Sequence, residues 1–244
     1  MVAQWGGILA SFNYGLLFWV DGVSSLLAAT LLYITLSPKR NSATEVKVKE
    51  KKAVKDSVYK DHGYLVFIIL VFVFALCFFQ LFTTIPVFFK ENFKLSVFFI
   101  GMIMALNGLI ISLFKMITVF SLEGRRSPLH YISTGMLLVC ISFLLLNLPF
   151  VNYAMIALIS MVILTFGEIF SMPFMNAWWI GRSKQNNRGQ YAALYTVAWA
   201  SAQAVGPFAG ALIAEHLSYK LLWFIVGGIC FLLAIFYQQL QKVR

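Results

Sequence analysis

Charged residues are scarce in this sequence: they make up 11% of the 244 residues, whereas soluble proteins carry about 25%. Hydrophobic residues make up 61% of the chain and aromatic residues 16%, and the mean hydropathy is +0.84. This composition excludes an ordinary soluble domain. It predicts a protein that crosses a membrane several times.

Cysteine is also rare. The chain has three, and each lies inside an apolar run: Cys77, Cys140 and Cys230. An odd number of buried thiols gives neither a disulfide framework nor the paired spacing of a metal site. The three histidines have no second ligand at a useful spacing, and neither a phosphate-binding loop nor a nucleophile elbow is present. We therefore expect no metal, no cofactor and no enzymatic activity.

Long apolar segments are what the sequence does have. Seven of them come near the ~20 residues that a membrane-spanning helix needs, at 15–36, 64–89, 96–120, 130–149, 152–179, 191–214 and 220–239. The sequence predicts an all-α, polytopic membrane bundle of about seven helices. We expect three parts: residues 1–36, a basic loop at 37–63, and a six-helix half at 64–244.

Basic residues are distributed unevenly over the connectors between these segments. Fifteen of the 19 lysines and arginines lie in the connectors 37–63, 121–129 and 180–190 and in the C-terminal tail, and three lie in the opposite connectors. The positive-inside rule therefore places the first set and the C-terminus in the cytoplasm. The loop 37–63 also carries acidic residues, so it predicts a solvated connector and no nucleic-acid surface.

One carboxylate, Glu168, stands near the middle of an apolar segment. A charge there costs about 2.5–3.5 kcal/mol on insertion scales, so such residues usually face a bundle interior or a wet cavity. We expect Gly167 and Pro173 to weaken the helix around it. Glu168 is our candidate for carrying a coupling proton. The alternative is a protonated or hydrogen-bonded carboxyl with a structural role.

Three amides and one indole lie at a similar depth to Glu168. Gln80 and Asn107 are isolated in their apolar segments, and Trp199 and Gln203 are four residues apart on one helix face. Together they predict a cavity that could hold a solute. The alternative is that these amides only form hydrogen bonds between helices.

The first residues of the chain resemble residues near its end. Five positions are identical at an offset of 204 residues, pairing Gly6, Ala10, Leu17, Trp19 and Tyr33 with Gly210, Ala214, Leu221, Trp223 and Tyr237. Such a long period suits a transporter built of two parallel halves. We therefore expect the chain to hold the end of a fifth helix and helices six to twelve, with an N-terminal half or a second chain as its partner.

These features resemble the C-terminal part of a major facilitator superfamily transporter. The resemblance rests on the loop 37–63, on a cytoplasmic turn, on the start of the eleventh helix, and on a Gly-Pro-x-x-Gly motif within it. The residues concerned are Gly124, Arg125, Arg126, Arg188, Gly206, Pro207 and Gly210. In the last motif, small residues allow close helix packing and proline removes a backbone donor. Ser121 stands where the turn of the family usually has Asp.

The residues around Glu168 resemble the tenth-helix motif of proton-coupled oligopeptide transporters. That family usually has Ser before the proline and Gly after it, whereas this chain has Met172 and Phe174. The rest of the chain resembles the drug:proton antiporter branch more closely. The resemblance implies proton-coupled transport of a small solute by alternating access, in a cell membrane. Oligopeptide uptake and a non-transporting membrane scaffold are the alternatives.

Overall fold

The computed structural model describes residues 57–148 and 152–242, together with Val23, Leu26, Leu27, Thr30 and Leu31. The chain divides into two compact units, residues 1–52 and 53–244. In the first unit the five described residues are helical and exposed. Most of the predicted span 15–36, all of the loop up to residue 56 and the N-terminal members of the 204-residue offset lie outside the described residues.

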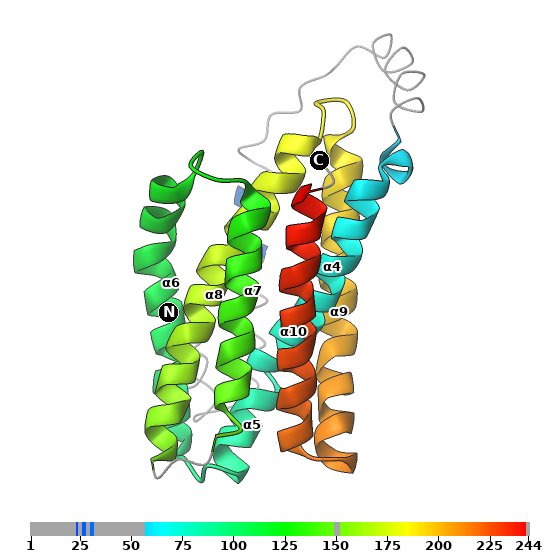
Figure 1. Ribbon diagram of the computed structural model, residues 1–244. Coiled ribbons are helices and arrows are strands. Elements are labelled where there is room, and N and C mark those ends of the chain that lie inside the picture. The colour runs from blue at the N-terminus through cyan, green and yellow to red at the C-terminus, as the bar shows by residue number, and fades with distance from the viewer. Residues whose placement is uncertain (1–22, 24–25, 28–29, 32–56, 149–151, 243–244) are drawn as a thin grey trace. The chain divides into compact units, whose positions relative to one another are not determined.

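The described part of the second unit is built of helices alone. They are η1 (Val58–Lys60), α4 (His62–Phe78), η2 (Phe79–Leu81), α5 (Thr84–Glu91), α6 (Val97–Leu122), α7 (Pro128–Leu145), α8 (Tyr153–Arg182), α9 (Arg188–His216) and α10 (Tyr219–Lys242). Six spans are long and apolar enough to cross a membrane when His62–Glu91 counts as one. This confirms the predicted all-α bundle (Figure 1).

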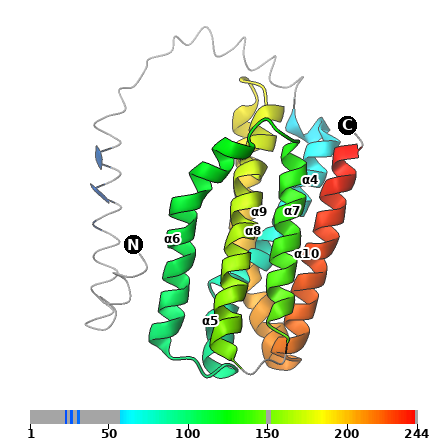
Figure 2. The same cartoon turned by 60° about the vertical axis from the view of Figure 1, so that its left-hand side comes forward.

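The helices of the second unit run up and down between two ends (Figures 1 and 2). The start of α4, the α6–α7 turn, the α8–α9 turn and the end of α10 share one end, which we call the basic end. The α5–α6, α7–α8 and α9–α10 connections lie at the opposite end. The basic connectors 121–129 and 180–190 thus lie at the same end as the start of α4 and the end of α10.

The core of the bundle forms where α7 packs between α8 and α10. Gly135 of α7 faces Gly167 of α8, and a Cβ atom added to Gly135 would lie 2.6 Å from the carbonyl oxygen of Gly167. Glycine is required at this crossing because only hydrogen fits between the two backbones. Helices α6 and α9 are much less enclosed, with 22% of their most apolar stretch buried against 56% in α7 and α8.

The structure adds two details about helix continuity. The predicted span 64–89 corresponds to His62–Glu91, which contains the 3₁₀ turn η2, and Gln80 lies in this break. The helix α8 continues through Gly167 and Pro173, so any weakening there does not interrupt it. In α8, the glycine fits the close contact with α7. The side chain of Gln80 supplies hydrogen bonds at the break in α4–α5.

Candidate functional site

Glu168 lies in the contact between α8 and α6. Its side chain is buried, with 4% exposed. Asn107 of α6 donates from Nδ2 to Glu168 Oε1 at 3.2 Å and to Thr165 Oγ1 at 2.9 Å. Asn107 and Thr165 are also buried. The structure thus brings together two residues that the sequence singled out and adds Thr165, which was not predicted.

Local sequence explains why these three side chains meet. Thr165 and Glu168 are three residues apart in α8 and therefore share a helix face. The Thr165 hydroxyl donates to the carbonyl of Met161 at 2.7 Å, so its oxygen is free to accept from Asn107. On α6, Asn107 takes a place in the buried stripe between Ile103 and Ile110. Asn107, a polar residue in this apolar stripe, thus contacts Glu168, the one acidic residue of α8.

In the part of the chain that the structure describes, no cation lies within ion-pair distance of Glu168. Lys115, two turns further along α6, is exposed. Between described residues, the ion pair within 4 Å joins Asp61 and Arg182. An ionised carboxylate in such a site is costly, and protonation removes that cost. The arrangement can therefore take up and release a proton.

Gln80 takes part in a different cluster. Its Nε2 donates to the carbonyls of Gly206 at 2.7 Å and Leu76 at 3.0 Å, and its Oε1 accepts from the Thr84 hydroxyl at 2.6 Å. A Cβ atom on Gly210 would overlap the side chain of Gln80. These bonds are the interhelical alternative foreseen for the amides. Through Gln80, η2 contacts α9 at Gly206 and Gly210, the two glycines of the Gly-Pro-x-x-Gly motif.

Trp199 and Gln203 lie apart from Glu168. Trp199 is half-buried and packs edge-on against Phe74, Phe78 and Phe79 of α4 and η2, with ring centroids 5.7–6.2 Å apart. Gln203 is exposed on α9. The four residues predicted to line one cavity therefore fall into separate places in the described bundle. Of the four, Asn107 alone contacts the carboxylate.

The arginines of the predicted turn motifs lie at the basic end. Gly124, between α6 and α7, has φ +79°, a conformation that glycine adopts at little cost. Arg125 is exposed, and Arg126 Nη1 lies 2.9 Å from His130 Nε2. Arg188 begins α9, as predicted, and its Nε donates to Ser183 Oγ at 3.4 Å.

A second carboxylate, Asp61, organises the basic end and was not predicted. It accepts from Arg182 Nε at 2.6 Å and Nη2 at 2.7 Å, from the Tyr191 hydroxyl at 2.8 Å, and from the Tyr64 backbone N–H at 3.1 Å. Burial by itself raises the pKa of Asp61, but these hydrogen bonds and the charge of Arg182 outweigh it and lower the pKa to about 2. Asp61 thus ties the ends of α4, α8 and α9 together.

Comparisons with known proteins place these features in a family. The sequence model of the Major Facilitator Superfamily matches residues 5–207 and, separately, 132–242. Curated proteins give no match. A solved POT family transporter in complex with 5-aminolevulinic acid is 17% identical, with a TM-score of 0.60, and the match covers 92% of this chain and 53% of that one.

A second solved structure gives the same result. It is a POT family transporter in complex with a thioalcohol conjugated peptide, 16% identical, with a TM-score of 0.61, and the match covers 94% of this chain and 54% of that one. At this identity the likeness establishes the fold alone. The chain spans about half the length of both solved structures.

Proposed function

We propose that this chain, which belongs to the major facilitator superfamily of membrane transporters, forms one half of a proton-coupled secondary transporter for a small solute. One observation carries the proposal: Glu168 is buried between two helices, and among the described residues it has one side-chain donor, the neutral Asn107, and no cation within 4 Å. Carboxylates of this kind inside membranes are most often part of ion or substrate pathways.

The proposed mechanism is alternating access. Glu168 takes up a proton while the cavity faces the more acidic side and releases it into the cytoplasm. Asn107 donates through an N–H that an ionised or a neutral carboxyl oxygen can accept, so the site keeps its geometry while its charge changes. The change in charge alters the cost of exposing or burying the site, and this biases the rocking of the two halves.

The substrate class has two candidates. The general resemblance of the sequence favours a drug:proton antiporter. Oligopeptide-type uptake is favoured by the sequence around Glu168. It is also consistent with the two POT family structures, which are complexes with 5-aminolevulinic acid and with a thioalcohol conjugated peptide. A scaffold without transport activity is a third possibility, and it requires Glu168 to be dispensable.

Membrane vesicles from cells that express the gene in its native context test the proposal. An imposed pH gradient should drive accumulation of ethidium if the protein is a drug antiporter, or of radiolabelled dialanine if it is a peptide symporter. Vesicles from a deletion strain are the control. Accumulation should collapse when a protonophore is added. Flux that is indifferent to the protonophore would refute proton coupling.

Orientation is part of the proposal: the basic end and the C-terminus face the cytoplasm. Gln185 is exposed at the basic end, and Asn92 is exposed at the opposite end. A cysteine at each position gives a matched pair, since the native cysteines are buried. In intact cells a membrane-impermeant thiol reagent should label Asn92→Cys and spare Gln185→Cys. The reverse pattern would invert the orientation.

We further propose that a second six-helix half completes the cavity, either joined through the loop 37–63 or supplied by another chain. The exposed faces of α6 and α9 leave room for such a partner. Proteoliposomes that contain the purified chain alone should then show no solute flux above empty vesicles. Substrate-specific uptake by the chain alone would instead favour a homodimer.

A further inference from the structure

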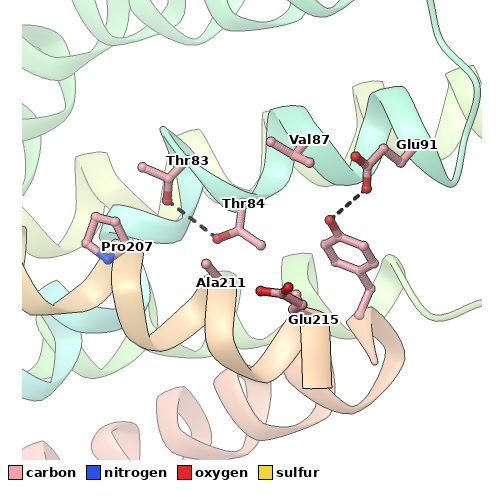
Figure 3. A pocket seen from close by; sticks show the side chains of 9 residues that line it. Thr83, Thr84, Val87, Glu91, Pro207, Ala211 and Glu215 are labelled. Atoms are coloured by element: carbon pink, nitrogen blue, oxygen red, sulfur yellow. Dashed lines mark hydrogen bonds between the residues drawn. The ribbon is translucent and has the colours of Figure 1, made fainter. Parts of the chain in front are cut away.

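A pocket of about 660 Å³ lies toward the end of the bundle opposite the basic end. Its walls are Thr83 and α5 on one side and the last turns of α9 with the start of α10 on the other (Figure 3). The lining residues are Thr83, Thr84, Val87, Glu91, Pro207, Ala211, Ala214, Glu215 and Tyr219. Glu168 does not line it, because Glu168 lies in the α6–α8 contact.

Two carboxylates, Glu91 and Glu215, line the pocket. Glu91 is the last residue of α5, and Glu215 lies in the last turn of α9. Helix C-termini carry partial negative charge, so these carboxylates add to a field of the same sign. The Tyr219 hydroxyl donates to Glu91 Oε2 at 3.0 Å and holds that carboxylate at the pocket wall. No lysine or arginine is among the lining residues.

The inner wall offers further acceptors. The Thr84 hydroxyl donates to Gln80 Oε1 at 2.6 Å, and the Thr83 hydroxyl donates to the Phe79 carbonyl at 3.1 Å. The two hydroxyl oxygens lie 3.4 Å apart (Figure 3), and their remaining lone pairs can accept hydrogen bonds. Pro207 has no N–H, so the α9 carbonyl four residues before it lacks its usual helical donor.

We propose that this pocket binds a small organic cation, namely a protonated amine carried on an apolar body. The carboxylates and hydroxyl oxygens accept the hydrogen bonds of the ammonium group, and Val87, Ala211 and Ala214 contact the apolar part. The volume lies within the range of about 300–1,000 Å³ that is typical of organic ligand sites. A metal ion fits less well, because no group of three or more His, Cys, Asp or Glu able to hold one occurs among the described residues.

Binding of radiolabelled 2-phenylethylammonium to the purified full chain in detergent tests this proposal by equilibrium dialysis. The neutral isostere 2-phenylethanol should compete poorly. Glu91→Gln and Glu215→Gln should each weaken binding about fivefold, since each removes one partly solvated ion pair. Glu123→Gln, an exposed acid at the basic end, is the matched control and should leave binding unchanged.

A second pair of variants separates loss of the site from loss of the fold. Ala211→Trp fills the pocket without removing a carboxylate and should abolish binding. Ala204→Trp, on an exposed position of the same helix outside the pocket, should not. The proposal is overturned if the amine shows no saturable binding, if 2-phenylethanol competes equally, or if binding survives in Ala211→Trp. Loss of binding in Glu168→Gln with retention in Glu215→Gln would place the amine at the α6–α8 site instead.

Discussion

Two carboxylates in this bundle have opposite surroundings. Asp61 at the basic end receives two hydrogen bonds from Arg182, one from a tyrosine hydroxyl and one from a backbone N–H. Glu168 in the α6–α8 contact receives one, from Asn107. An acid with a cation and a full set of donors stays ionised and holds helices together. An acid with one neutral donor can change its charge without dismantling the structure around it.

One helix connects the two regions. Arg182 and Glu168 both belong to α8, 14 residues apart, which is about 21 Å along a helix axis. The basic end of α8 is fixed by the ion pair, and its middle is fixed by the glycine contact with α7. Glu168 therefore lies on a rigid element, while α6 on its other side packs mainly against α8.

The largest expected effect comes from the packing beneath Glu168. Gly135→Leu would force a side chain into the backbone of α8 and should cost about 3 kcal/mol or prevent folding. Gly108→Leu is the control, since a Cβ atom there meets nothing within 4 Å. Yield and size-exclusion profile in detergent measure the effect. Equal behaviour of the two variants would contradict the close packing of α7 against the middle of α8.

The same acid-to-amide change should act differently at the two carboxylates. Asp61→Asn leaves Arg182 without its anion and should lower the free energy of unfolding by about 1–3 kcal/mol. Glu168→Gln keeps an acceptor for Asn107 and leaves no charged partner behind, so it should lower stability less than Asp61→Asn does. Unfolding of both variants in a denaturing detergent series measures this. Equal losses would remove the distinction between a structural and a functional acid.

The stability difference between wild type and Asp61→Asn should depend on pH. The pKa of Asp61 lies at about 2 in the folded chain, below its ordinary value of 3.8. Its stabilising contribution is therefore complete above about pH 4 and is lost as the pH falls toward 2. The difference in melting temperature between wild type and Asp61→Asn should be constant from pH 7 to 5 and shrink below pH 4. A difference that already shrinks between pH 7 and 5 would contradict the assigned pairing.

The sequence predicted the six described spans, for a physical reason, and it singled out Glu168, whose role stays a prediction. A bilayer demands long apolar helices, and an ionisable residue within one is conspicuous because of its cost. Asn107 was conspicuous in the same way, and it does contact Glu168. The break at Gln80 was not predicted, since Phe79-Gln80-Leu81 contains no glycine or proline. The residues that permit it, Gly206 and Gly210, lie on another helix.

Asp61 was missed because it stands at the end of a loop with many charges of both signs. One local signal was available: an Asp directly before an apolar run is a typical helix N-cap, and Asp61 does cap α4. Its pairing with Arg182 spans 121 residues of sequence, so it depends on the packing of α4, α8 and α9. The pocket between α5 and α9 escaped prediction for the same reason.

The central claim is that Glu168 carries the coupling proton, and one measurement tests it most directly. Wild type and Glu168→Gln are each expressed in the native context of the gene, and vesicles are prepared that contain equal amounts of either protein. The two preparations are compared for substrate accumulation driven by a pH jump and for exchange of labelled substrate without a gradient. The account predicts that Glu168→Gln abolishes accumulation and retains exchange, because the amide mimics a permanently neutral site. Equal accumulation by both proteins would show that Glu168 is structural and that coupling resides elsewhere.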